Sequence, residues 1–241
     1  MSMSIVLACT AAAAAFTQCN QSVTPTLPRI GGGVELAAPE ANFALKKIAI
    51  GHGIQNYSCV DLTGNFTAAG ALAVLYDATC YYPGTAKTGI VQQKWDQIPT
   101  HVLWNTPLPL NKLPGSKYGA HPVQPFRAQA DLKLPGLATF PFLGHHYFSS
   151  AGVPVFDLVV ARLRADVKKL YGIDAPSSAD RGILDSGAVQ WLQLGDAGTG
   201  QARGSDMVYR VITAGGGAET CPVAGVGVQS VPYTAFYWFY G

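Results

Sequence analysis

The stretch TAFYWFYG, residues 234–241, decides the fold, because it places aromatic side chains on both faces of what would be a β-strand. Successive side chains of a strand point to opposite sides, so a strand with large apolar groups on each side must be covered on both. Two further strand-like segments precede it, separated by glycine-rich turns: AVQWLQLG at 188–195 and DMVYRVIT at 206–213. This part of the chain therefore predicts three strands.

The composition of the whole chain favours the same β-rich class. Of its 241 residues, 27 are Gly, 16 are Pro and 11 are Tyr, whereas 12% are charged. Turn formers and aromatic residues in place of Lys and Glu favour strands over long surface helices. We predict one all-β domain, a mainly antiparallel β-barrel or β-sandwich. A formal net charge of +2 lacks the dense positive surface of nucleic-acid-binding proteins, so no nucleic acid is expected as a partner.

The first half of this domain adds further strand-like segments. KKIAIGHGIQNYSCV, residues 46–60, predicts a strand, a Gly-His-Gly turn and a second strand. Gln55, Tyr57 and Cys59 would share one face of that second strand, because side chains two apart point the same way. GALAVLYDATCYY, residues 70–82, is a third apolar run.

One segment predicts a peripheral helix, over about residues 157–171. In DLVVARLRADVKKLYG, residues 157–172, Asp157 could cap the start and Gly172 could end the helix. Its charged side chains fall outside the apolar stripe and predict a solvated basic face. The stripe, about 100° wide at 3.6 residues per turn, consists of Val159, Val160, Leu163, Val167 and Leu170.

Of two proline-rich segments, one precedes the predicted domain, residues 43–241, and the other lies within it. Residues 17–42 predict an extended, poorly packed N-terminal arm. A short apolar run, HVLWN at 101–105, leads into a Pro-rich segment at 105–142, where the proline density blocks helices and central strands. This segment predicts a long loop that either covers a ligand or is a passive surface excursion.

The first residues predict a secreted protein. An apolar run from Ile5 to Phe16 ends in small alanines, although no Lys or Arg precedes it. This run is too short to span a bilayer, so no membrane span is expected. We predict a signal peptide at 1–16 and an extracellular or cell-wall location; an apolar segment packed on the domain is the alternative.

Glycosylation sequons and cysteines suit the same compartment. Removal of the leader would remove Cys9 and leave Cys19 in the adjoining tail, and an oxidising compartment would pair two of the remaining three cysteines. These three are Cys59, Cys80 and Cys221. The three sequons begin at Asn20, Asn56 and Asn65.

The sequence predicts neither a cofactor nor a metal. The glycine cluster in VYRVITAGGGAET, residues 208–220, follows a strand, as a dinucleotide-binding turn would. The residues after it cannot form the helix whose N-terminus holds a pyrophosphate, so a nicotinamide-dependent dehydrogenase is not expected. The cysteines lack zinc-site spacing, and the sequence nominates no catalytic pair of carboxylates.

Two adjacent histidines stand in LGHHYF, residues 143–148. Neighbours in a strand point to opposite faces, so His145 and His146 cannot both face one site unless the backbone bulges. A hydrogen-bonded structural histidine is therefore favoured over a metal-binding or catalytic pair.

Several segments together resemble one family. They are IAIGHGIQNYSC (48–59), GALAVLYDATC (70–80), LGHHYF (143–148), GAVQWLQL (187–194), VYRVITAGGGAETC (208–221) and VPYTAFYWFYG (231–241). In this order they resemble the secreted domain of unknown function 3455 of fungi and bacteria, most closely its fungal members. Some members carry a malate dehydrogenase label, which the glycine cluster does not support.

The resemblance implies a secreted β-rich domain and a disulfide between Cys59 and Cys221, with a Cys59–Cys80 bridge as the alternative. A G-x-H-Y motif of the family falls on Gly144, His146 and Tyr147, which singles out the second histidine. The chain departs from the fungal pattern at 161–180, where relatives often have a further cysteine, so Cys80 is expected to be unpaired.

Two functions remain open from the sequence. The favoured one is a non-enzymatic extracellular or cell-wall protein that binds a carbohydrate or small molecule, with Trp104, Tyr147 and Trp191 around a cleft under the Pro-rich flap. The alternative is a secreted hydrolase or lyase with His146 as the acid-base group. Its polar partners would be Gln55, Tyr57 or Arg210.

Overall fold

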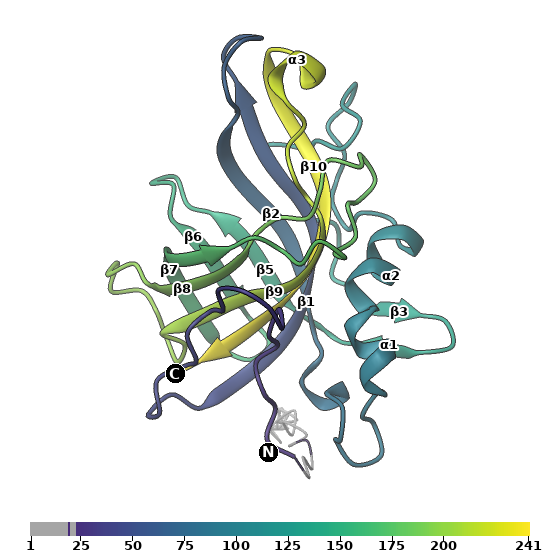
Figure 1. Cartoon of the computed structure of the whole chain (residues 1–241), viewed down its shortest axis with the longest axis vertical. Helices are drawn as coiled ribbons and strands as arrows, with labels where there is room; N and C mark the ends of the chain where they lie inside the picture. Colours follow the sequence, from purple (N-terminus) through teal and green to yellow (C-terminus); the bar gives the residue numbers. More distant parts are fainter. Residues whose placement is uncertain (1–18, 20–22) are drawn as a thin grey trace, which may run out of the picture.

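The computed structural model describes residue 19 and residues 23–241, and within them the chain forms a closed antiparallel barrel of eight strands (Figure 1). The strands follow one another round the ring in chain order, and the last closes it against the first. The all-β prediction is confirmed, as a barrel. The predicted leader lies outside the described residues. The barrel strands are β1 (Leu45–Cys59), β2 (Thr67–Asp77), β5 (Phe142–Phe148), β6 (Pro154–Leu158), β7 (Leu163–Ile173), β8 (Trp191–Asp196), β9 (Met207–Gly215) and β10 (Gly227–Tyr240).

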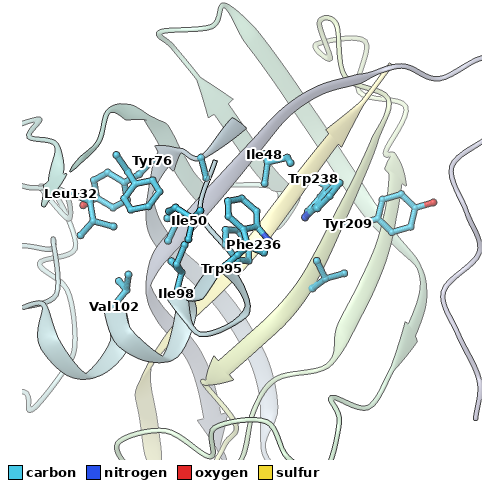
Figure 2. Close-up of a cluster of buried hydrophobic side chains, with 14 of the residues drawn as sticks. Ile48, Ile50, Tyr76, Trp95, Ile98, Val102, Leu132, Tyr209, Phe236 and Trp238 are labelled. Carbon is cyan, nitrogen blue, oxygen red and sulfur yellow. The ribbon is translucent and has the colours of Figure 1, made fainter. Parts of the chain in front are cut away.

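Strand β10 is buried on both faces, as its aromatic pattern predicts. On the inner face, Tyr233, Tyr237 and Phe239 pack in the barrel interior. On the outer face, Phe236 and Trp238 belong to a second apolar cluster outside the barrel wall (Figure 2). The protein therefore has two hydrophobic layers that share one strand.

The outer layer comes from the long segment between β2 and β5. The ring of Trp95 stacks on Phe236 with centroids 4.4 Å apart, and Ile98 and Val102 lie beside it (Figure 2). The elements of this segment are the 3-10 turn η1 (Thr79–Tyr81), helices α1 (Gln92–Asp96) and α2 (Ile98–Asn105), and the hairpin β3 (Leu132–Leu134) and β4 (Ala138–Phe140). Figure 1 shows helices α1 and α2 on one side of the barrel.

The short apolar run at 101–105 forms the second half of helix α2, because its apolar side chains continue a one-sided pattern that begins at Ile98. The Pro-rich segment 105–142 contains the short β3–β4 hairpin and covers the outside of the barrel, where Leu132 and Phe140 join the outer cluster.

The helix predicted over 157–171 is wrong: this segment is the hairpin of β6 and β7. Residues 159–162 form the turn, with Val159 and Val160 exposed, and Arg162 adopts a positive φ of 56°. The sequence fits both periods, since Ala165 and Val167 also alternate with polar neighbours. The segment forms a strand because β7 pairs with β6 on one side and with β8 on the other.

The predicted Gly-His-Gly turn is also wrong, because β1 runs without interruption through residues 51–53. Gly51 and Gly53 are needed here because a larger side chain would not fit. A Cβ on Gly51 would come within 2.5 Å of the Tyr237 ring, and one on Gly53 would overlap the backbone of Leu72 on the neighbouring strand. The glycines thus let β1 lie close to large side chains and to β2.

Two disulfides join distant segments. Cys59 pairs with Cys221, as the resemblance implied, with Cα atoms 5.6 Å apart. Cys80 is not unpaired, because it bonds to Cys19 and ties the N-terminal arm to the outer layer. Further along the arm, Leu27, Ile30 and Leu36 pack against the outer cluster, so this arm is better packed than its composition predicts.

We expect Gly53→Ala to lower the free energy of unfolding by at least about 2 kcal/mol, because the added methyl group meets backbone that cannot rotate away. Urea denaturation measures the change. Gly32→Ala is the matched control, since a Cβ at Gly32 meets no atom within 4 Å. Equal stability of the two variants would contradict the close-packing explanation.

Candidate functional site

One end of the barrel interior is hollow. The other end is filled by side chains such as Leu143, Leu158 and Phe239, which belong to the inner cluster. The hollow end encloses a cavity of about 590 Å³. Its walls are mostly apolar and include Phe66, Ala71, Phe148, Phe156, Leu192 and Leu194.

Four predicted site residues line this cavity together. Gln55 and Tyr57 come from β1, His146 from β5 and Arg210 from β9. They converge because each occupies an inward position of its strand. The barrel thus gathers groups that are far apart in the sequence.

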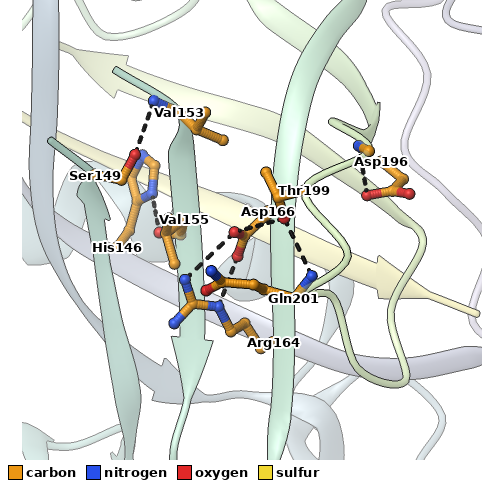
Figure 3. A network of polar contacts seen from close by, with 10 residues as sticks. His146, Ser149, Val153, Val155, Arg164, Asp166, Asp196, Thr199 and Gln201 are labelled. Carbon is orange, nitrogen blue, oxygen red and sulfur yellow. Dashed lines mark hydrogen bonds and ion pairs between the residues drawn. The ribbon is translucent and has the colours of Figure 1, made fainter. Parts of the chain in front are cut away.

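His146 is held as a neutral side chain. Its ring stacks on Phe156 with centroids 4.0 Å apart, and its Nδ1 bonds to the carbonyl oxygen of Val155 at 2.9 Å (Figure 3). Burial lowers its pKa to about 4, against a smaller raising effect of the Val155 carbonyl, and the charge of Arg210 lowers it further. With Nδ1 as the donor, the ring is uncharged at neutral pH.

The two histidines point to opposite sides, as strand geometry predicts. His145 lies outside the barrel, where its ring stacks on Phe126 of the Pro-rich segment with centroids 4.0 Å apart. His146 therefore contributes to the cavity without its neighbour.

Tyr57, Tyr237 and Arg210 contribute polar groups to the wall. The hydroxyls of Tyr233 and Tyr237 lie 2.8 Å apart, and the Tyr57 hydroxyl donates to the carbonyl of Gly216 at 2.6 Å. Burial raises the pKa of Tyr57 and of Tyr237, and Arg210 partly opposes both shifts. The guanidinium is thus close enough to affect both phenols electrostatically.

Lys169 also lines the cavity, although the sequence predicted a solvated helix face for it. Its ammonium donates to the side-chain oxygen of Gln190 at 3.0 Å. The two-residue period of β7 could have identified Lys169 from the sequence, because Lys169 lies on the same face of the strand as Ala165 and Val167.

The aromatic residues predicted to surround a ligand lie elsewhere. Trp104 and Trp191 line a separate hollow beside α2, where the Trp104 indole donates to Asp180 at 2.8 Å. Tyr147 follows His146 in β5 and so faces the other side of the wall. The Pro-rich segment covers His145, not the cavity.

Acid-base groups are few in the lining. In the part of the chain that the structure describes, no carboxylate lines the cavity, and His146 bonds to the backbone. Among the described residues, no group of three His, Cys, Asp or Glu could hold a metal ion. Within the same part of the chain, no helix is long and apolar enough to cross a membrane.

Acid should destabilise the fold through two buried histidines. Burial lowers the pKa of His52 and of His146 to about 4 each, so below pH 6.5 the unfolded chain takes up protons that the folded chain refuses. We expect each histidine to lower the free energy of unfolding by about 2 kcal/mol between pH 7 and pH 4.5.

Urea denaturation at both pH values measures this loss in the native protein and in His146→Gln. The variant should lose about 2 kcal/mol less than the native protein, because one of the two groups is gone. The same pH dependence in both proteins would show that His146 is not buried as a neutral ring.

Comparison with curated proteins and with solved structures finds no match. The family described as protein of unknown function (DUF3455) matches residues 39–241, which is most of the chain and the whole barrel. The chain therefore belongs to the DUF3455 family.

Proposed function

We propose that this barrel is a secreted, non-enzymatic protein that holds a small, mostly apolar molecule in its open end. The observation that carries the proposal is the cavity of about 590 Å³ in an interior that is otherwise densely filled. Its volume and its apolar walls with few polar groups are those of small-molecule sites.

The cavity exists because small side chains stand where the strands could carry large ones. Ala68 and Ala71 of β2 line it, whereas the filled end holds Phe239 and several leucines. An empty apolar cavity forfeits packing contacts, so a guest molecule would stabilise this arrangement.

An apolar guest is favoured over a carbohydrate. A sugar presents many hydroxyl groups, each of which needs a partner once it is buried. The cavity has few polar groups, and the tyrosine hydroxyls among them already bond to protein atoms. Trp104 and Trp191, the candidates for stacking on a sugar, lie outside it.

An enzymatic role for His146 has less support. A group with a pKa of about 4 is a poor base near neutral pH, and no carboxylate in the lining could orient it or share a proton. We assign the ring a role in shaping the cavity wall, together with Phe156.

Two disulfides suit the secreted setting of the proposal. Of the predicted glycosylation sites, Asn65 is exposed between β1 and β2, and Asn56 is half-buried and accepts a hydrogen bond from Ser230. Asn20 lies outside the described residues. Modification at these sites stays a prediction.

Binding of the neutral dye 1-N-phenylnaphthylamine, followed by its fluorescence, tests the proposal. The native protein should bind it, and Ala71→Phe and Ala68→Trp should weaken binding at least tenfold, because the new rings occupy the cavity. Ala68→Trp serves if Ala71→Phe does not fold, since Ala68 lies exposed at the rim.

Val160→Trp is the matched control, because Val160 is exposed in the turn between β6 and β7, away from the cavity. It should bind like the native protein. No dye binding by the native protein, or unchanged binding by the cavity variants, would refute the proposal.

A further inference from the structure

We propose that the guest of this cavity carries a carboxylate, and that Arg210 is the residue that binds it. This inference rests on the proposed function and names the chemical class of the ligand: an apolar acid, with its body against the rings of the cavity and its charge at the β8–β9 wall.

The first support is the charge of the lining. Of the residues that the structure describes, two cations, Arg210 and Lys169, line the cavity, and no Asp or Glu does. Neither cation forms an ion pair within the described residues. An otherwise apolar cavity with only positive charge is complementary to an anion.

The second support is that both cations have neutral partners. Arg210 donates from Nε to the backbone carbonyl of Gln190 at 3.0 Å. Lys169 donates to the side-chain oxygen of the same Gln190. The two positive groups are thus held on either side of one residue, with no negative charge against them.

Arg210 acts electrostatically on the wall around it. Burial raises the pKa of Tyr57, Tyr233 and Tyr237, and the charge of Arg210 opposes this rise; burial lowers the pKa of His146, and Arg210 adds to that lowering. Arg210 is half-buried in this wall, and a bound carboxylate would supply a counter-charge to its guanidinium. A guanidinium also matches a carboxylate in geometry, since both are planar forks.

An unused donor points the same way. The side-chain nitrogen of Gln55, which lines the cavity, is buried and has no hydrogen-bond partner among the described residues. A buried donor without an acceptor is costly. Arg210, Lys169 and Gln55 thus offer hydrogen-bond donors to a ligand, and an ionised carboxylate is a pure acceptor.

The test compares acids with their neutral amides. The assay measures, at neutral pH, how tightly decanoate, 2-naphthoate and the primary amide of each compete with 1-N-phenylnaphthylamine for the full chain. The native protein should prefer at least one acid over its amide by tenfold or more. Arg210→Met should reduce that preference to less than threefold while the amide binds within twofold of its native affinity.

Arg203→Met is the matched control, because Arg203 is exposed in a loop and does not line the cavity. It should keep the native preference. If Arg210→Met does not fold, Lys169→Met takes its place, with Lys168→Met as its control, because Lys168 does not line the cavity. Lys169→Met should lower the preference at least threefold and Lys168→Met should not.

The outcomes separate this inference from the proposed function. Binding of dye and amides without any preference for the acids would overturn the carboxylate assignment and leave the small-molecule cavity intact. A preference that survives Arg210→Met, or that survives Lys169→Met where Arg210→Met does not fold, would also overturn it. Absence of all binding would refute both.

Discussion

The burial of β10 on both faces is the constraint on which the rest of the structure depends. Its inner aromatic rings fill the barrel and its outer rings need a second layer, which the segment between β2 and β5 supplies. Strand β1 adapts to the same rings with Gly51 against Tyr237. The cavity begins where this filling ends, so the packing of one strand determines the position of the site.

The cavity holds a neutral histidine and a charged arginine at close quarters, and burial separates their behaviour. An imidazole can give up its proton when desolvation disfavours its charge, as that of His146 does, whereas a guanidinium keeps its charge in proteins. Arg210 and Lys169 therefore determine the electrostatic character of the wall, and His146 determines part of its shape.

The sequence predicted the strands that alternate clearly or are apolar on both faces, together with the opposite directions of His145 and His146. It failed at 157–171, because that segment fits both the helical and the strand period and only pairing decides between them. For the site, Gln55, Tyr57, His146 and Arg210 were named and lie together. Lys169 was missed, since an exposed lysine that lines a cavity has the same sequence pattern as any solvated lysine. The tryptophans lie beside α2.

The pairing of β1 with β10 has a consequence for how the protein is made. These two strands are the first and the last of the barrel, and Cys59 and Cys221, which join them, are 162 positions apart. During synthesis one edge of β1 stays unpaired until residues 227–240 have left the ribosome. An open strand edge is a template for aggregation, so the nascent chain depends on shielding until its final strand arrives.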